Sequence, residues 1–300
     1  MSIHIPDSVT SIGHNAFKGC ISLKNIHIPD SVTSIGSNAF EGCVSLKSII
    51  IPDSVTRIER WTFYYCKSLK SIIIPDAVTS IGDSAFSDCK SLIDINIPNG
   101  VTSLGDSAFS NCHSLTSVTI PSSVIAIGVN PFYGCPADLK NESKAFIYEH
   151  NVLFNKDKTT LISYRAKEAN YVIPDSVTSI GGCAFLECNS LTSIIIPDSV
   201  TSIGVWAFAQ CNSLTSINIP DSVTTIGNHA FLFCKSLTSI NISNSVMSIG
   251  DNAFEGCASL KSIKIPDSVT SIGDYAFGEC DSLSPQVKSD IIQRFGENVF

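Results

Sequence analysis

The sequence predicts an α/β solenoid, a right-handed superhelix of similar coils with a parallel β-sheet and short helical turns. One observation behind this prediction is a period of 23 residues, marked by cysteines that share one repeat position: Cys20, Cys43, Cys66, Cys89, Cys112, Cys135, Cys188, Cys211, Cys234, Cys257 and Cys280. A second is that the residues around each cysteine recur with it. A fixed period in this range is typical of a solenoid, in which each coil buries an apolar face against its neighbours. The hand follows from the preference of parallel-strand crossovers.

Residues 214–234 show what one unit contains. Residues 214–219 end in apolar residues with a period of two, which predicts a strand. Pro220 ends the pairing because it has no N–H, and Pro-Asp-Ser favours a type I turn. The β-branched residues 223–226 predict a second, shorter extended segment. Residues 229–234 are helix-tolerant and predict a single helical turn.

The chain is expected to form one elongated solenoid over residues 1–300, because a solenoid grows without enlarging a central core. Regular repeats occupy residues 1–135 and 173–284, and an irregular insertion separates them at 136–172. Main strands of the parallel sheet are expected at nine equivalent positions: 23–28, 46–51, 69–74, 92–97, 115–120, 191–196, 214–219, 237–242 and 260–265.

The insertion predicts a β-hairpin, because residues 152–154 and 161–164 flank the polar turn 155–160. Two interpretations stay open: an enlarged coil that keeps the stack continuous, or a dedicated binding loop. Asn141 begins an Asn-x-Ser sequon, which matters only in a secreted chain.

The repeat stops at Leu283, and residues 285–300 predict a C-terminal capping helix. Ser284 is suited to the N-cap, Pro285 to the first turn and Gly296 to the stop. The helix would carry one apolar stripe, made by Val287, Ile291, Ile292 and Phe295.

The first coil begins within a repeat, and residues 2–6 match the end of a strand with no cap before them. An uncapped coil exposes a strand edge that can pair with another chain. Either a partner pairs with this N-terminal coil, or the chain is part of a longer protein. Residues 1–5 show neither the basic nor the apolar region of a signal peptide. The compartment is therefore open.

The net charge of −8 argues against nucleic acid as a partner, because binding phosphates requires clustered Lys and Arg. No stretch reaches the roughly 20 apolar residues of a membrane helix, so membrane insertion is not expected.

Eleven of the twelve cysteines share one repeat position and are expected to be buried, reduced thiols. Stacked coils place their Cα atoms about 5 Å apart, within disulfide range, but in-register side chains point in parallel and not at each other. The spacing of a zinc site is absent.

An aspartate column follows the repeated proline: Asp7, Asp30, Asp53, Asp76, Asp175, Asp198, Asp221 and Asp267. Calcium requires six to eight oxygens in one cage, so we expect these carboxylates to accept backbone hydrogen bonds in their turns instead. The histidines accompany no nucleophile elbow or catalytic pairing. We expect no enzyme activity, no cofactor and no metal.

The outward position of the main strands carries two adjacent apolar residues, Ile50 and Ile73. Beside them Lys24, Lys47 and Lys70 form a basic ladder, which repels itself unless an acidic group or a partner lies across it. The alternatives are a solvated sheet face whose lysines discourage edge pairing and a partner-binding surface.

The repeated pattern L-x-x-I-x-I-P-x-x-V-x-x-I-G-x-x-A-F-x-x-C resembles the BspA-like class of leucine-rich repeat over most of the chain. The resemblance implies a parallel-stranded leucine-rich-repeat solenoid used for adhesion or protein binding, often at a cell surface. It implies no catalytic residue.

The third unit departs from the pattern at several places at once. Glu59 replaces Gly, Trp61 replaces Asn or Ser, and Thr62 replaces Ala; Tyr64 and Tyr65 follow at positions that are mostly small or polar. Local rules broken together indicate function, and exposed Trp and Tyr are enriched in interface hot spots. The alternative is a local surface repair in which the aromatic rings pack over residues 59–60.

A second, weaker apolar patch is expected from Trp206, Leu232 and Phe233. Three functions are compatible with these observations: a non-enzymatic protein-binding or adhesion solenoid, a passive structural or surface-coat array, and more weakly a carbohydrate or calcium binder. The candidate partner-binding residues are Trp61, Tyr64, Tyr65, Ile50, Ile73, Trp206 and Phe233.

Overall fold

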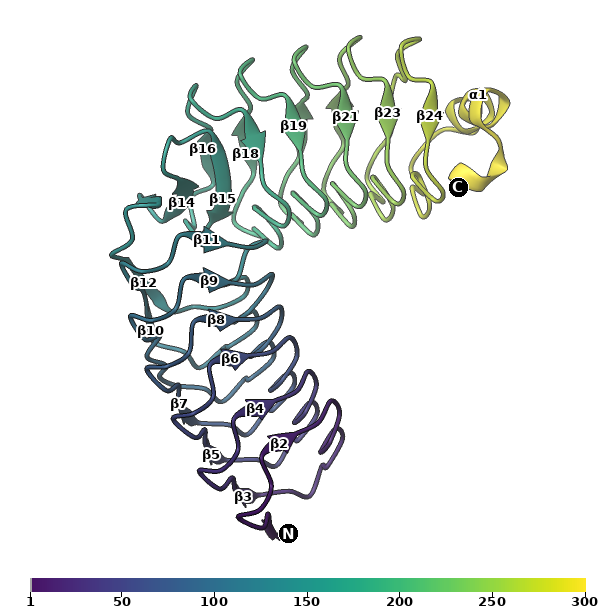
Figure 1. The fold of residues 1–300 in the computed structure, drawn as a ribbon. Helices are drawn as coiled ribbons and strands as arrows, with labels where there is room; N and C mark the ends of the chain where they lie inside the picture. Colours follow the sequence, from purple (N-terminus) through teal and green to yellow (C-terminus); the bar gives the residue numbers. More distant parts are fainter. Residues whose placement is uncertain (1) are drawn as a thin grey trace. The chain divides into compact units, whose positions relative to one another are not determined.

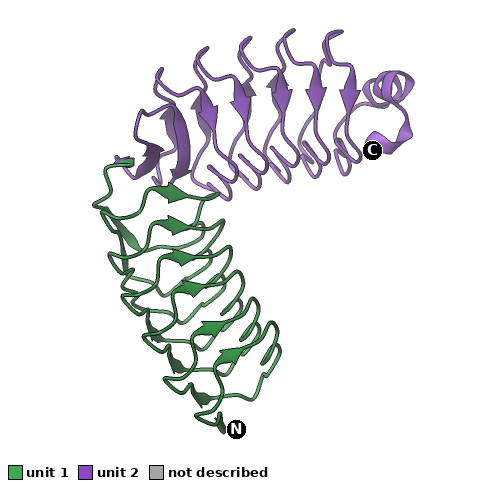
Figure 2. Cartoon of the chain, in the orientation of Figure 1, with its two compact units in different colours: residues 1–147 green, residues 148–300 purple. Residues whose placement is uncertain are grey.

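The computed structural model describes residues 2–300, which form a parallel-strand solenoid of about 12 turns (Figure 1). The chain divides into two compact units, residues 1–147 and 148–300 (Figure 2). Most coils contribute a main strand, a second short strand and a series of turns. The two kinds of strand form separate columns in each unit.

The main strands of unit 1 pair in parallel, and partners in the regular coils lie one period apart, as Ile50 and Ile73 show. They are β1 (Ser2–His4), β3 (Asn25–His27), β5 (Ser48–Ile50), β7 (Ser71–Ile73), β10 (Ser117–Ile120) and β12 (Asp138–Asn141). The second strands are β2 (Ser11–Ile12), β4 (Ser34–Ile35), β6 (Arg57–Ile58), β8 (Ser80–Ile81), β9 (Ser103–Leu104) and β11 (Ala126–Ile127). β13 (Phe146–Glu149) spans the boundary between the units.

Unit 2 begins with the predicted hairpin, since β14 and β15 pair antiparallel and β15 then pairs in parallel with β17. The hairpin prediction is confirmed. The strands of this unit are β14 (Val152–Asn155), β15 (Thr160–Tyr164), β16 (Asn170–Val172), β17 (Ser179–Ile180), β18 (Ser193–Ile195), β19 (Ser202–Ile203), β20 (Ser216–Asn218), β21 (Thr225–Ile226), β22 (Ser239–Asn241), β23 (Ser248–Ile249) and β24 (Ser271–Ile272).

Seven of the nine expected main strands are present, each shorter than expected. At 92–97 and 260–265 only isolated bridges form, between Ser71 and Asp94 and between Ser239 and Ser262.

The core is a set of columns in which each side chain packs on its equivalent one coil away. The phenylalanine column is the clearest: ring centroids of Phe40 and Phe63 lie 5.6 Å apart, and those of Phe63 and Phe86 lie 5.4 Å apart, all stacked. In the insertion Tyr164 takes the place of phenylalanine and stacks on Phe185 at 4.9 Å. The hairpin therefore supplies an enlarged coil to the stack of unit 2.

The predicted helical turns are wrong. In the second coil Phe40 and Gly42 donate their N–H groups to Thr62 and Tyr64 of the next coil, at 2.9 and 2.8 Å. Between them Glu41 closes a turn onto the carbonyl of Asn38 at 3.1 Å. Alternate N–H groups thus bond between coils, whereas an α-helix would use all of them internally. The only helices within residues 2–300 are α1 (Pro285–Phe295) and the 3-10 helix η1 (Glu297–Val299), so the α/β class is also wrong.

These turns place two residues of each coil in the left-handed region. In the second coil they are Asn38 (φ 60°) and Gly42 (φ 70°), the residue types that adopt this conformation most easily. Equivalent residues recur throughout, including Asn15, Ser84, Asp88, Gln210 and Asn252.

All twelve cysteines are free thiols, and nine of them are buried. The thiol of Cys66 donates to the carbonyl of Phe40 at 3.2 Å, and that of Cys89 donates to Phe63 at the same distance. Burial raises the pKa of the Cys66 and Cys89 thiols well above the ordinary value, and it raises that of Cys43 to about 12. The repeat position therefore suits a small apolar residue that can also donate a weak hydrogen bond.

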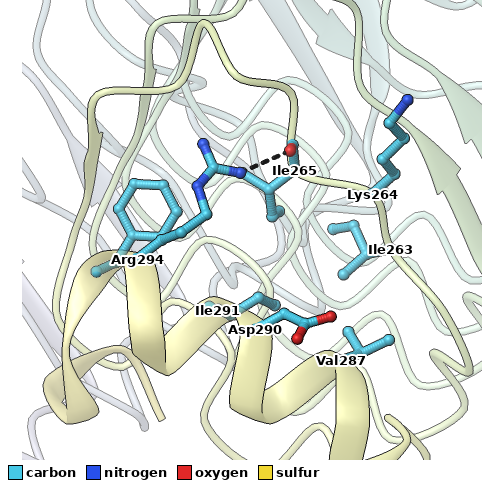
Figure 3. A pocket seen from close by; sticks show the side chains of 8 residues that line it. Ile263, Lys264, Ile265, Val287, Asp290, Ile291 and Arg294 are labelled. Atoms are coloured by element: carbon cyan, nitrogen blue, oxygen red, sulfur yellow. Dashed lines mark hydrogen bonds between the residues drawn. The ribbon is translucent and has the colours of Figure 1, made fainter.

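Helix α1 begins and ends as predicted: the hydroxyl of Ser284 accepts from Val287 N–H, and Gly296 follows the last turn. The guanidinium of Arg294 donates to the carbonyls of Ile265 and Pro266 at 2.9 and 3.0 Å. A cavity of about 250 Å³ lies between the helix and residues 263–265 (Figure 3). Helix α1 thus supplies donors to backbone carbonyls of the last coil.

Candidate interaction surfaces

The structure separates the candidate residues onto three surfaces. Trp61, Tyr64 and Tyr65 lie in the turns of the third coil, between β6 and β7. Ile50 and Ile73 lie on the outward face of β5 and β7. Trp206 and Phe233 belong to unit 2. Each surface is described by itself below.

The third-coil patch, formed by Trp61, Tyr64 and Tyr65, is exposed at both ends. Trp61 is 38 % and Tyr65 37 % exposed, whereas Tyr64 is half-buried with its ring 5.9 Å from that of Tyr65. The Arg60 guanidinium lies 5.1 Å from the Trp61 ring centroid, and the Lys67 ammonium lies 4.0 Å from the Tyr65 ring centroid. Both distances are within cation–π range. The patch therefore combines aromatic area with positive charge.

Two of the three aromatic residues occupy left-handed backbone positions, with φ 57° at Trp61 and 61° at Tyr65. The second coil holds Asn38 and Gly42 at the same positions. Bulky side chains adopt this conformation at a cost of roughly 1–2 kcal/mol each. Sequence reasoning missed this feature, although the recurrence of Asn, Gly and Asp in these two columns was a signal for it.

The third aromatic residue, Tyr64, is half-buried and is affected by the charges of two acidic side chains. Burial raises the pKa of the Tyr64 phenol, and the negative charges of Asp88 and Glu41 raise it further. The phenol therefore stays protonated at neutral pH and can donate a hydrogen bond to a partner.

The remaining departures of the third coil have local contacts. Thr62 is fully buried in the alanine column, where its hydroxyl donates to the carbonyl of Glu59 at 2.8 Å. The Glu59 carboxylate pairs with Arg57 Nε at 3.4 Å. These two side chains, with Arg60 and Asp83, line a hollow of about 340 Å³ beside the patch. Because the Trp61 ring lies against Arg60 but Tyr65 lies against Lys67, the expected packing over residues 59–60 accounts for one ring and not the other.

The patch expected from Trp206, Leu232 and Phe233 lacks one of its members. Leu232 is 5 % exposed and belongs to the core. The Trp206 ring stacks on His229 with centroids 4.3 Å apart, and both residues have positive φ. The Phe233 ring covers Gly256 so closely that a Cβ there would lie 2.0 Å from it. Trp206 and Phe233 are thus partly covered by neighbouring coils.

On the main-strand face, Ile50 and Ile73 lie in register and are 70 % and 74 % exposed. The expected hydrogen bonds of the aspartate column are not made: within residues 2–300, none of its carboxylates accepts one. The serine of the same turn bonds instead, as when Ser54 Oγ donates to Val32 O at 2.6 Å. The aspartates are exposed or half-exposed carboxylates, and no three His, Cys, Asp or Glu side chains in this range lie close enough to hold a metal ion.

The sequon asparagine is engaged within the fold. Asn141 Nδ2 donates to the carbonyls of Ser143 and Phe146 at 3.1 and 2.9 Å. The Ser143 hydroxyl is buried and donates to Val124 O. The side chains of this sequon serve local structure.

A solenoid of 23-residue coils with parallel main strands and inward leucine and isoleucine columns defines a leucine-rich repeat protein. The sequence pattern of the BspA type leucine rich repeat region matches six copies, over residues 1–115, 79–155 and 163–284. The chain belongs to the BspA-type leucine-rich repeat family.

Several solved structures are similar to this chain. A leucine rich cell surface protein from Faecalibacterium prausnitzii is 34 % identical with a TM-score of 0.77, over 94 % of this chain and 86 % of that one. The pneumococcal vaccine antigen PcpA is 26 % identical with a TM-score of 0.77, over 94 % and 76 %. A leucine-rich repeat protein from Bacteroides ovatus is 28 % identical with a TM-score of 0.51, over 100 % and 91 %.

No curated protein matches the sequence. Within residues 2–300, none of the helices has the length and apolar character needed to cross a membrane.

Proposed function

We propose that this protein is a non-enzymatic protein-binding or adhesion solenoid of a cell surface, and that the third-coil patch contacts the partner. The observation that carries the proposal is the placement of Trp61 and Tyr65 at left-handed positions that neighbouring coils fill with Asn, Gly, Ser or Asp. Strained residues that bring no evident gain in stability concentrate at functional sites. Tryptophan and tyrosine are also the residues most enriched in interface hot spots.

The surface location is supported by the similarity to the Faecalibacterium prausnitzii protein, which is described as a leucine rich cell surface protein. Labelling of intact source cells with an antibody to the chain tests it. Staining only after the cells are permeabilised would contradict a surface location.

The binding role is tested by exchanging the patch for the residues of a regular coil. Peptides are selected from a displayed random library on the wild-type chain and then titrated against Trp61→Asn/Tyr65→Gly. Since Asn38 and Gly42 hold these positions in the second coil, the variant keeps a fold-compatible backbone. We expect at least a tenfold loss of affinity, which corresponds to about 1.4 kcal/mol.

Trp206→Asn is the matched control, because it removes an aromatic residue from the same column in unit 2. Peptides that bind the patch variant and the wild type equally would favour the passive structural array.

A further inference from the structure

The main-strand face of unit 1 has a charge arrangement that repeats in three consecutive coils. In each coil a central residue points outward. A lysine lies three positions before this residue, and an aspartate lies three positions after it. The triplets are Lys24–His27–Asp30, Lys47–Ile50–Asp53 and Lys70–Ile73–Asp76. The lysine immediately precedes the main strand, and the aspartate lies in the turn that follows the strand. One edge of the face is therefore basic and the other acidic.

The charges on this face have no partners within the described chain. All three lysines and all three aspartates are exposed. Among residues 2–300 none of the six charged groups forms an ion pair within 4.0 Å or accepts or donates a hydrogen bond. The two ladders are thus unneutralised within the unit.

The lysine ladder also brings like charges close together. Lys47 N–H donates to Lys24 O at 3.2 Å, and Lys70 N–H donates to Lys47 O at 3.1 Å, so successive lysines are backbone neighbours. Like charges in such neighbouring positions destabilise a sheet. Neither the lysines nor the aspartates of these triplets make a contact that stabilises the fold within the described chain.

Two of the three central residues, Ile50 and Ile73, are apolar, and the third is His27. Ile50 and Ile73 lie in register on β5 and β7 and are 70 % and 74 % exposed. Strands β3, β5 and β7 lie side by side along unit 1 (Figure 1). An exposed apolar strip between a basic edge and an acidic edge is typical of an interface, with an apolar centre and a charged rim.

This arrangement is complementary to itself. A twofold axis parallel to the stack turns a second copy face to face and leaves every coil at its own level. It places the lysine edge of one copy opposite the aspartate edge of the other, on both sides, and places Ile50 and Ile73 against their equivalents. An isologous interface requires this kind of self-complementary surface. Both ladders advance by one coil per step, so their spacings match.

We infer that two copies of the protein associate through this face, with the lysines of each copy opposite the aspartates of the other. An acidic partner of another kind would neutralise the lysines only, whereas a second copy neutralises both ladders. The next two coils lose both charges together, with Ile93 and Asn99 in one and Thr116 and Ser122 in the other. The charged region therefore ends at the same coil on both edges.

The expected association is weak. Three to five coils at about 4.8 Å each and a width of about 20 Å bury about 300–500 Å² per partner. A stable interface buries about 800 Å² per partner. The dimer should therefore form with micromolar or weaker affinity and dissociate as salt screens the ladders. This inference concerns a different face from the third-coil patch and stands apart from the proposed binding function.

Charge exchange tests the inference by sedimentation velocity, from about 10 μM to about 1 mM protein at low salt, which spans the expected affinities. The first variant is Lys24→Glu/Lys47→Glu/Lys70→Glu, which makes both edges acidic. The second is Asp30→Lys/Asp53→Lys/Asp76→Lys, which makes both edges basic. We expect the wild type to dimerise, each variant alone to be monomeric, and an equimolar mixture to form mixed dimers.

The control variant, Lys235→Glu/Lys261→Glu/Lys264→Glu, makes the same change in net charge with exposed lysines of unit 2 and should dimerise like the wild type. A wild type that stays monomeric over the whole range would overturn the inference. So would variants that dimerise like the wild type, which is the outcome expected if copies pair through the N-terminal strand edge. A mixture that forms no mixed dimer would overturn it as well.

Discussion

The third and fourth coils of unit 1 share their inward residues, except that Thr62 stands where the fourth coil has Ala85, and they differ more in what they present outward. Phe63 and Phe86 are both fully buried with rings stacked at 5.4 Å. At one left-handed position the third coil has Trp61 where the fourth has Ser84, and at the other it has Tyr65 where the fourth has Asp88. The comparison teaches that the buried columns define the coil, while the left-handed positions accept any side chain at some cost in stability.

The largest expected effect comes from alkaline pH and acts on both coils through the cysteine column. Burial raises the pKa of Cys66 and Cys89, so above an ordinary thiol pKa of about 9 the unfolded chain loses protons that the folded chain retains. Stability should then fall as pH rises, by about 1.4 kcal/mol per pH unit for each buried thiol. Denaturant titrations at pH 7 and pH 10 measure this, and equal midpoints would contradict it.

Cys66→Ala/Cys89→Ala is the control for that experiment. Because this variant lacks two of the buried thiols, its unfolding free energy should fall less steeply with pH than that of the wild type. The same thiols are expected to react with a maleimide reagent only after unfolding. Many disulfides in protein purified without reductant would instead indicate an oxidising compartment.

Removing a shared ring should have the next largest effect. Phe86 has ring neighbours on both sides, so Phe86→Ala should cost about 3–5 kcal/mol of unfolding free energy. Phe17 in the first described coil is half-buried and stacks only on Phe40, so Phe17→Ala should cost clearly less. Equal costs in denaturant titration would argue against nearest-neighbour stabilisation of the stack.

Removing the aromatic rings of the third-coil patch should weaken association with a partner and leave folding unchanged. Trp61→Ala/Tyr64→Ala should weaken binding of a selected peptide by at least about 1–2 kcal/mol, because these rings are exposed or half-buried and resemble hot-spot residues. The melting temperature should stay nearly unchanged. A melting loss large enough to explain the weaker binding would assign these residues to structure.

The smallest expected effect comes from exchanging the residues at one left-handed position between the third and fourth coils. Trp61→Asn should stabilise the chain by about 1 kcal/mol, since Asn adopts positive φ more easily than Trp. Ser84→Trp in the fourth coil should destabilise it by a similar amount. Thermal melts of both variants measure the difference, and a loss of stability in Trp61→Asn would mean that packing of the Trp61 ring outweighs the backbone strain.

Much of the fold could be predicted because each coil must cover the next. The 23-residue spacing of Phe63 and Phe86 anticipates the stacking of their rings, and the polar turn at 155–160 anticipates the hairpin. Single deviations such as Trp61 could be recognised as candidates against so regular a background. Whether Trp206 and Phe233 form a patch could not be predicted from the sequence, because their rings pack against His229 and Gly256 of neighbouring coils.

The sequence by itself determined the period, the inward columns and the family, because these follow from the spacing of apolar residues. Only the tertiary structure decided the path of the turns, since the Ala-Phe-x-x-Cys segment tolerates a helix in isolation. Bonds such as Phe40 N–H to Thr62 O exist only when the next coil is in place, and they draw residues 38 and 42 into the left-handed region. Backbone hydrogen bonds between coils therefore override local helical preference and leave Trp61 and Tyr65 in strained, exposed positions.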